Sequence, residues 1–257
     1  MMKRFISAVI VCVFCWPVAL AQTSELGLFN HLAVGASVGT EGWGVDLAVP
    51  VTQWAAIRAG ISKYPEIMKY STTVSLEDVE AEGVLTTDEI TLEGKINTDI
   101  NYKVLVDLYP FKNSSFHLTA GAFYGPRNFA SAYNTEPFLA EKDWGTAGVT
   151  IGDYRITTDE NGIIQANVEF EQLKPYLGLG FGRAVPNKRV NVTCDFGVKL
   201  WGTPGIYMWT KDEWGDNVYQ ELTKEGLGDD QFNDAFDIMS KVTVYPVLSI
   251  RISGKIF

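Results

Sequence analysis

The chain has little cysteine, little histidine, a deficit of basic residues and no long apolar run beyond its start. Its 257 residues include three cysteines and two histidines, and 31 acidic residues outnumber 21 basic ones, for a formal net charge of −10. An acidic surface repels phosphate groups, which excludes nucleic acid as a partner. After residue 21, no stretch approaches the roughly 18 consecutive apolar residues of a membrane-spanning helix, which excludes a helical membrane protein but not a barrel.

The start of the chain has the pattern of an export signal. A basic start, an apolar run and a small-residue cleavage site follow one another at residues 3–4, 5–18 and 19–21. We therefore predict a signal peptide over residues 1–21 and one mature domain over residues 22–257, with a formal charge of −12. Cys12 and Cys15 leave with the signal, so Cys194 remains and cannot form an internal disulfide.

Alternation of apolar and polar residues with a period of two dominates the mature chain and indicates strands with two unlike faces. It recurs in eight segments, at residues 32–38, 43–49, 55–61, 102–109, 116–122, 177–182, 190–200 and 242–256. The segments are close to the roughly 9–11 residues of a tilted strand that crosses a bilayer. In hydrocarbon a sheet pairs all its amides only when it is closed. We therefore predict an all-β fold, an eight-stranded antiparallel transmembrane β-barrel.

The connections between these segments are sorted by length. Short turns at residues 50–53, 112–115 and 185–188 alternate with long connections at residues 63–97, 126–168 and 203–240. The long connections carry formal charges of −5, −3 and −7. With both termini on one side of a membrane, this order predicts short periplasmic turns and three long acidic outer loops.

The last long connection loses the strand pattern over residues 216–240. Helical spacing of Phe232, Ala235, Phe236 and Met239 predicts a short amphipathic helix there. The aspartates at positions 229, 230, 234 and 237 could offer oxygen ligands to calcium, but they do not form an EF-hand pattern. A solvated helix face is the favoured interpretation, and no metal site is predicted.

Charged residues on the polar parity of the strands should face the barrel interior. They are Asp46, Arg58, Lys103, Asp107, Asp195, Lys199, Arg251 and Lys255. An interior enclosed by eight strands is just wide enough for side chains to fill. Because an unpaired buried charge is costly, these residues should form ion pairs. Two interpretations stay open: a satisfied polar plug that closes the barrel, which we favour, or a gated pore with a cationic lining.

Aromatic residues cluster at or near the ends of the predicted strands. They are Trp43, Trp54, Tyr102, Tyr124, Trp201, Tyr207, Trp209 and Tyr245. Interfacial girdles of a membrane barrel would place them there. The alternative is that aromatic residues are simply frequent in strands.

Little in the chain points to catalysis. The two histidines, His31 and His117, fall at strand ends next to the turns, and no acidic residue close in sequence could orient His117. We therefore predict that the protein is not an enzyme and uses no cofactor.

Several strand motifs resemble a known group of proteins. They are Leu105–Phe111, Phe116–Gly121, Pro175–Gly182, Phe196–Val198 with Gly202–Pro204, and Tyr245–Ser249. In these stretches the sequence resembles the small outer-membrane β-barrel proteins of Gram-negative bacteria, the OmpW/OmpX-like porin-family group. The resemblance implies a monomer in the outer membrane, in contact with lipid and lipopolysaccharide. It also implies recognition of the terminal Phe257 by the outer-membrane assembly machinery, although Phe257 is out of phase with Ile252 and Ile256.

Two functions follow from this sequence. The first is a porin-like conduit for ions or small solutes, gated by the charges of the lumen. The alternative is a closed structural or surface-interaction barrel whose acidic outer loops bind partners.

Overall fold

The computed structural model describes residues 29–65, 69–75, 80–111, 114–227 and 241–256. The predicted signal peptide, the helix and aspartates predicted between residues 229 and 239, and Phe257 lie outside the described residues. Within the described ranges, no helix is long and apolar enough to cross a membrane.

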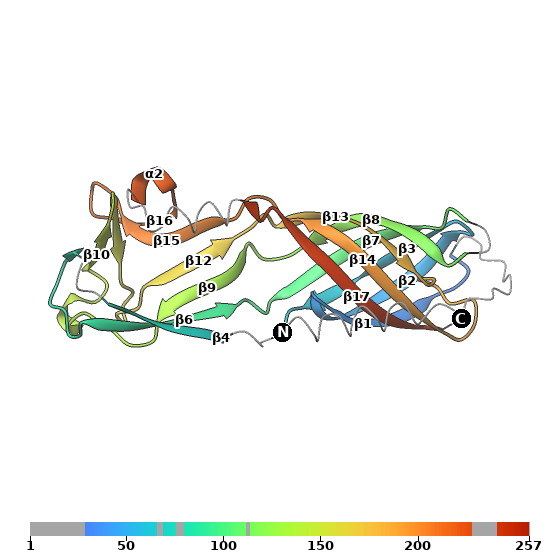
Figure 1. The fold of residues 1–257 in the computed structure, drawn as a ribbon, viewed down its shortest axis with the longest axis horizontal. Coiled ribbons are helices and arrows are strands. Elements are labelled where there is room, and N and C mark those ends of the chain that lie inside the picture. The colour runs from blue at the N-terminus through green and yellow to red at the C-terminus, as the bar shows by residue number, and fades with distance from the viewer. Residues whose placement is uncertain (1–28, 66–68, 76–79, 112–113, 228–240, 257) are drawn as a thin grey trace.

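Eight antiparallel strands form a closed barrel, as the alternation predicts. They are β1 (Ala33–Gly39), β2 (Gly42–Thr52), β3 (Ala55–Lys63), β7 (Ile100–Leu108), β8 (Phe116–Tyr124), β13 (Leu173–Phe181), β14 (Val190–Leu200) and β17 (Val244–Lys255). Their order around the barrel is β1-β17-β14-β13-β8-β7-β3-β2, and β2 closes the sheet by pairing with β1. This barrel occupies one half of the elongated molecule in Figure 1.

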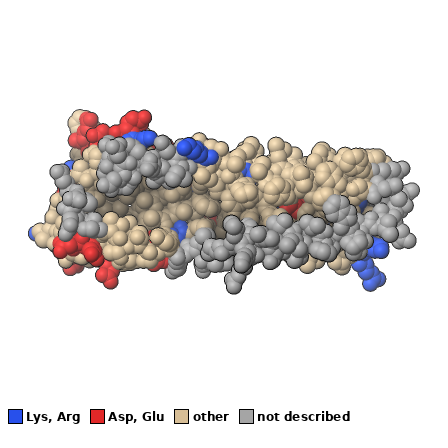
Figure 2. Space-filling view, viewed as in Figure 1, with Lys and Arg blue, Asp and Glu red and all other residues tan. Residues whose placement is uncertain are grey.

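The two faces of the barrel wall differ sharply in polarity. Along β14, Asp195 and Lys199 are buried inside, whereas Val192 and Phe196 on the other parity are about half exposed. Successive side chains of a strand point to opposite faces, so the apolar parity forms the outside of the barrel and the polar parity fills it. On the face shown in Figure 2, charged side chains are sparse along the barrel and gather over the opposite end of the molecule.

The long connections are largely strands rather than irregular loops. They contribute β4 (Lys69–Ser75), β5 (Glu80–Ala81), β6 (Glu89–Ile96), β9 (Asn128–Asn134), β10 (Gly148–Ile151), β11 (Tyr154–Thr157), β12 (Gln165–Glu169), β15 (Gly205–Lys211) and β16 (Asn217–Leu222). These strands form a second sheet in the order β4-β6-β9-β12-β15-β11-β10-β5, with β16 also paired to β15. Strands β4, β6, β9, β12 and β15 keep the order of the barrel strands to which the chain joins them, namely β3, β7, β8, β13 and β14. The second sheet therefore extends one end of the barrel (Figure 1).

The second sheet has an apolar core of its own. Phe138, Leu139, Ile156, Met208 and Leu222 are buried there together. The short helix α2 (Lys224–Leu227), in the last connection, adds Leu227 to this core, and the 3-10 turn η1 (Glu141–Asp143) lies between β9 and β10. Strand β16 corrects the expectation that residues 216–240 have no strand, because its six residues pair with β15 along their whole length.

Candidate functional site

An arginine joins three strands across the barrel interior. Arg58 on β3 donates through Nη1 to Asp195 Oδ2 on β14 and through Nη2 to Asp107 Oδ1 on β7, both at 2.8 Å. Thr119 on β8 donates from Oγ1 to the same Asp107 oxygen at 2.7 Å. All four side chains are buried. Charge-assisted bonds of this length are the strong class of hydrogen bond, so this group ties the barrel wall together from within.

A second ion pair lies beside the first. Arg251 on β17 donates to both oxygens of Asp46 on β2, from Nε at 2.9 and 3.0 Å and from Nη2 at 2.6 Å. Its Nη1 donates to the carbonyl oxygen of Ala184 at 3.0 Å. Lys103 Nζ lies 3.8 Å from Asp46 Oδ2. A side chain at Gly35 would collide with the Arg251 guanidinium, so the glycine makes room for this arginine.

Lys199 pairs with Glu41 near the end of the barrel that bears the second sheet. Its Nζ also lies 4.4 Å from the ring centroid of Phe123, 5.6 Å from that of Tyr64 and 5.5 Å from that of Tyr245. A desolvated ammonium among aromatic faces is stabilised by cation–π attraction. Lys199 is fully buried, so neither solvent nor a solute reaches this cation in the structure.

Tyr64 and Tyr245, which lie beside Lys199, belong to a group of contacting aromatic rings that we call the mouth cluster: Tyr64, Phe129, Phe170, Trp201 and Tyr245. Phe170 and Trp201 stack with their centroids 4.1 Å apart. Trp201 is 4% exposed, and its ring nitrogen donates to the carbonyl oxygen of Val242. The girdle predicted for Trp201 and Tyr245 is therefore wrong, because both share the inward parity of their strands.

His117 is a residue of this site that sequence reasoning missed. It is fully buried on β8, and its Nε2 lies 2.8 Å from Asp195 Oδ1, although 78 residues separate the two in sequence. His117 does lie at the turn end of β8, as predicted, but its burial and its acidic partner were missed, since folding supplies the acid that the local sequence lacks. The ring packs against Tyr109, and Gly180 leaves space for the pair, since a Cβ there would lie 2.6 Å from Nε2.

The structure brings together seven of the eight charged residues predicted to line the lumen. Lys255 is the eighth: it is partly buried, lies at the turn end of β17, and its backbone N–H donates to Arg189. Phe257 lies outside the described residues. In the part of the chain that is described, no three His, Cys, Asp or Glu side chains are grouped as a metal site requires.

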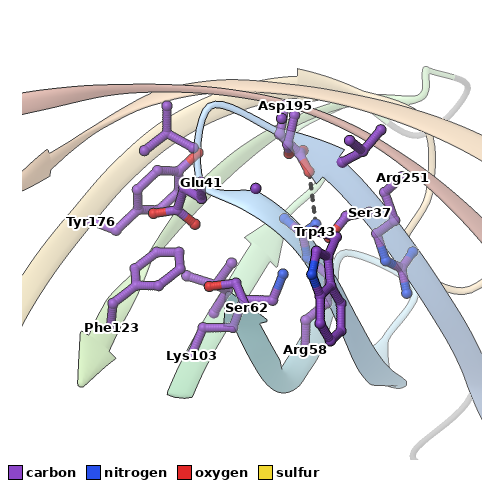
Figure 3. Close-up of a pocket in the computed structure, with 16 residues that line it drawn as sticks. Ser37, Glu41, Trp43, Arg58, Ser62, Lys103, Phe123, Tyr176, Asp195 and Arg251 are labelled. Carbon is purple, nitrogen blue, oxygen red and sulfur yellow. Dashed lines mark hydrogen bonds and ion pairs between the residues drawn. The ribbon is translucent and has the colours of Figure 1, made fainter. Parts of the chain in front are cut away.

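Little space remains among these side chains. The cavity drawn in Figure 3, lined by Glu41, Arg58, Lys103, Tyr176, Asp195 and Arg251 among others, has a volume of about 20 Å³. That volume holds about one water molecule. Tyr176 fills much of the remainder, with its hydroxyl 2.5 Å from where a Cβ would stand at Gly178 or Gly197. The ion-paired side chains and Tyr176 therefore fill the part of the lumen that surrounds this cavity.

Comparisons with known proteins give only distant likenesses. No family model matches the chain, and no curated protein matches it. The crystal structure of Acinetobacter baumannii CarO2 shares 17% identity, covers 88% of this chain and 98% of its own, and gives a TM-score of 0.47. For CarO of the same organism the values are 15%, 90%, 99% and 0.45. For a major outer membrane protein from Thermus thermophilus they are 13%, 88%, 98% and 0.40. Likenesses this weak carry no argument, so the assignment of the barrel depends on its own strands.

Proposed function

We propose that the chain is an outer-membrane barrel with a closed lumen, and that it holds the second sheet at the cell surface to bind a partner. The observation that carries this proposal is the ion-paired interior, which leaves room for about one water. The porin-like conduit is the other function that the sequence predicts, and it requires the ion pairs of this interior to separate.

The outside of the barrel supports a membrane location. Large apolar side chains around the wall are exposed, among them Leu47, Val104, Leu118, Leu177, Phe196 and Ile252. Four of the aromatic residues predicted to form girdles, Trp43, Trp54, Tyr102 and Tyr124, are also exposed on the barrel. Soluble monomers rarely expose a continuous apolar surface of this extent. With the predicted signal peptide, this belt favours insertion as a monomer among lipid and lipopolysaccharide, with Phe257 recognised by the assembly machinery.

Opening the lumen would be costly. A continuous aqueous path would require Arg58 to separate from Asp107 or Asp195, or Arg251 to separate from Asp46. Water would then have to hydrate the separated charged groups. Breaking one partner from a buried ion pair typically costs about 3–5 kcal/mol. The mouth cluster would also have to move, because its Trp201 packs on Tyr245, which lies beside Lys199. The closed barrel is therefore the function that this geometry supports best.

Single-channel conductance of the refolded mature protein in a planar bilayer tests the closed lumen. Wild type and Arg251→Ala are compared, with folding established by heat-dependent gel mobility. A silent bilayer with folded protein supports the closed barrel. Discrete wild-type openings that change in amplitude with Arg251→Ala would instead establish a conduit through the lumen.

Surface labelling tests where the second sheet lies. In a Cys194→Ser background, Trp214→Cys places a thiol in the β15–β16 connection, where Trp214 is 86% exposed. Lys188→Cys places one in the exposed β13–β14 turn. On intact cells, a membrane-impermeant maleimide should label the first variant and reach the second only after permeabilisation. The opposite pattern would reverse the orientation and overturn the proposal.

A further inference from the structure

One face of the second sheet carries rings, amides and carboxylates in register. The pairing aligns Ser131, Asn167, Tyr207 and Glu221 in one row across β9, β12, β15 and β16. A second row lies on the same face, two residues away along each strand. It consists of Tyr133, Gln165, Trp209 and Tyr219. We call these eight residues, together with Glu169, the polar face.

The opposite face of the same strands is the packing face. Its row of Ala130, Val168, Ile206 and Leu222 is apolar throughout. Leu222 is buried in the apolar core of the second sheet, and Ile206 packs against that core. The polar face is therefore not needed to hold the sheet to its core, and its composition calls for another explanation.

Hydrogen bonds fix the side chains of the polar face before any ligand arrives. Asn167 is the centre: its Oδ1 accepts from Ser131 Oγ at 2.8 Å and from Gln165 Nε2 at 2.7 Å, and its Nδ2 donates to Tyr219 Oη at 3.1 Å. Tyr219 in turn donates to Glu169 Oε1 at 2.6 Å. Held side chains lose less conformational entropy on binding, which is the general advantage of preorganisation.

The rings of the polar face lie side by side. Tyr207 and Tyr219 stack with centroids 5.7 Å apart and an interplanar angle of 25°, and Trp209 lies 5.3 Å from Tyr219. Trp209 is 52% exposed, so much of its surface meets solvent. A hairpin can be stabilised by such cross-strand rings alone. That role does not account for the amide and carboxylate groups that surround them.

We propose that the polar face binds a saccharide chain that is rich in hydroxyl groups. The C–H faces of a sugar ring pack against exposed aromatic rings, and its hydroxyls pair with the exposed Gln165 amide, which donates and accepts, and with the exposed Glu221 carboxylate, which accepts. Charge does not select the ligand, because Arg127 lies 3.6 Å from Glu169, and Lys95, opposite Ser131, lies over the Tyr133 ring. The inference rests on the proposed function, which puts the second sheet outside the cell, and it names the class of ligand that the sheet binds.

The position of the polar face agrees with this ligand. Phe129, two residues before Ser131 and on the same face of β9, belongs to the mouth cluster. The polar face thus begins beside the mouth cluster, and in the proposed orientation it lies on the same side of the membrane as sugars attached to neighbouring lipid. The same chemistry would also recognise a glycan from another source, such as a polysaccharide in the surroundings.

Calorimetric titration of the detergent-solubilised mature protein tests the proposal and separates the two sources. The probes are cellohexaose, maltoheptaose, chitohexaose and the polysaccharide released by mild acid from the lipopolysaccharide of the producing strain. Each is titrated into wild type, Trp209→Thr, Trp209→Phe and Trp214→Ala. Threonine and phenylalanine are both favourable in a strand, so comparing the two variants measures the effect of removing the aromatic ring alone. Trp214→Ala is the control, because Trp214 is an exposed tryptophan outside the polar face.

At least one probe should bind wild type, with affinity reduced about tenfold in Trp209→Thr and retained in Trp209→Phe and Trp214→Ala, the loss expected for one stacking contact. Binding of the released polysaccharide alone identifies the sugars of the same membrane as the ligand, and binding of a plain oligosaccharide identifies an outside glycan. If no probe binds, or if Trp209→Thr binds as wild type does, the inference is wrong. A silent bilayer and a labelled Trp214→Cys would then leave the proposed function standing, whereas a conducting barrel would overturn that function alone.

Discussion

The barrel and the second sheet share their strand order, yet buried charged side chains are found in the barrel, whereas the second sheet buries apolar and neutral polar side chains. In β14, Asp195 and Lys199 are buried while Phe196 is 55% exposed. In β15, which follows directly, Met208 is buried in an apolar core and the exposed neighbour Trp209 lies on a polar face. The two regions therefore differ in the solvent for which their outer faces are suited: lipid for the barrel and water for the second sheet.

The comparison also separates what holds each region together. Barrel closure pairs the backbone, and Arg58 and Arg251 then neutralise the acids enclosed within it. The second sheet instead encloses Ile156, Leu222 and their neighbours, which are driven together by the hydrophobic effect. Substitutions that remove an interior ion pair or a side chain of the apolar core should reveal this difference in what stabilises each region.

The largest effect is expected from Arg58→Ala. It leaves Asp107 and Asp195 buried without their shared cation, which should lower the unfolding free energy by about 3–5 kcal/mol. The matched control is Arg155→Ala in the second sheet, where the pair with Glu82 is about half exposed and should contribute about 0–1 kcal/mol. Urea unfolding in lipid vesicles measures both. Equal losses would show that the interior ion pairs are not what holds the barrel.

Ile156→Ala should act on the second sheet alone. Ile156 is 1% exposed in the apolar core, and truncating such a residue costs about 3 kcal/mol through lost burial and a residual cavity. Limited proteolysis should then cut near β10 and β11, while the barrel keeps its heat-dependent gel mobility. Loss of that mobility as well would show that the two regions unfold as one unit.

A charge placed on each outer surface should distinguish lipid from water directly. Leu177→Arg, in the middle of β13, should destabilise the barrel by about 2–3 kcal/mol in vesicles. Val218→Arg, at a position that is 37% exposed near the start of β16, should change stability by no more than about 0.5 kcal/mol. If Leu177→Arg is as harmless as Val218→Arg, the apolar wall does not face hydrocarbon.

Alternation within strands predicted much of the barrel but could not predict its partners. Parity indicated that Arg58 and Asp195 face inward, and both lie there, but their contact joins residues 137 positions apart and depends on the register of the closed sheet. His117 was missed for the same reason, because its acid lies on another strand. Trp201 was assigned to the outside although it shares the parity of Lys199, so the sequence did contain the signal that places it inside.

The second sheet was harder to predict because its strands are short and mixed. In β16, Tyr219 and Glu221 occupy one face while Val218 and Leu222 occupy the other with Gln220 between them, so neither parity is clearly apolar. Such a strand gives no clear parity signal, although its pairing partner β15 is joined to it by the short connection at residues 212–216. The polar face depends on the pairing of these strands, and no local sequence motif predicts it.

The smallest effect, and the sharpest test of the polar face, is a change in stability at alkaline pH. Burial and the hydrogen bond to Glu169 raise the pKa of the Tyr219 phenol to about 12. An unfolded tyrosine loses its proton near pH 10, so between about pH 10 and 12 the folded state binds more protons than the unfolded state. The contribution of Tyr219 to stability is therefore complete below about pH 10 and is lost as the pH rises toward 12.

Tyr219→Phe should remove this part of the loss of stability at alkaline pH. Glu169→Gln should shift that loss toward lower pH, because the amide no longer favours the protonated phenol as strongly. Unfolding measured across this range, with phenolate absorbance at 295 nm, follows both variants. The barrel lies outside this linkage, so its heat-dependent mobility should respond to pH alike in all three proteins. An unchanged alkaline loss in Tyr219→Phe would mean that the hydrogen bond between Tyr219 and Glu169 does not order the polar face, and the preorganisation argued for its ligand would lose its central contact.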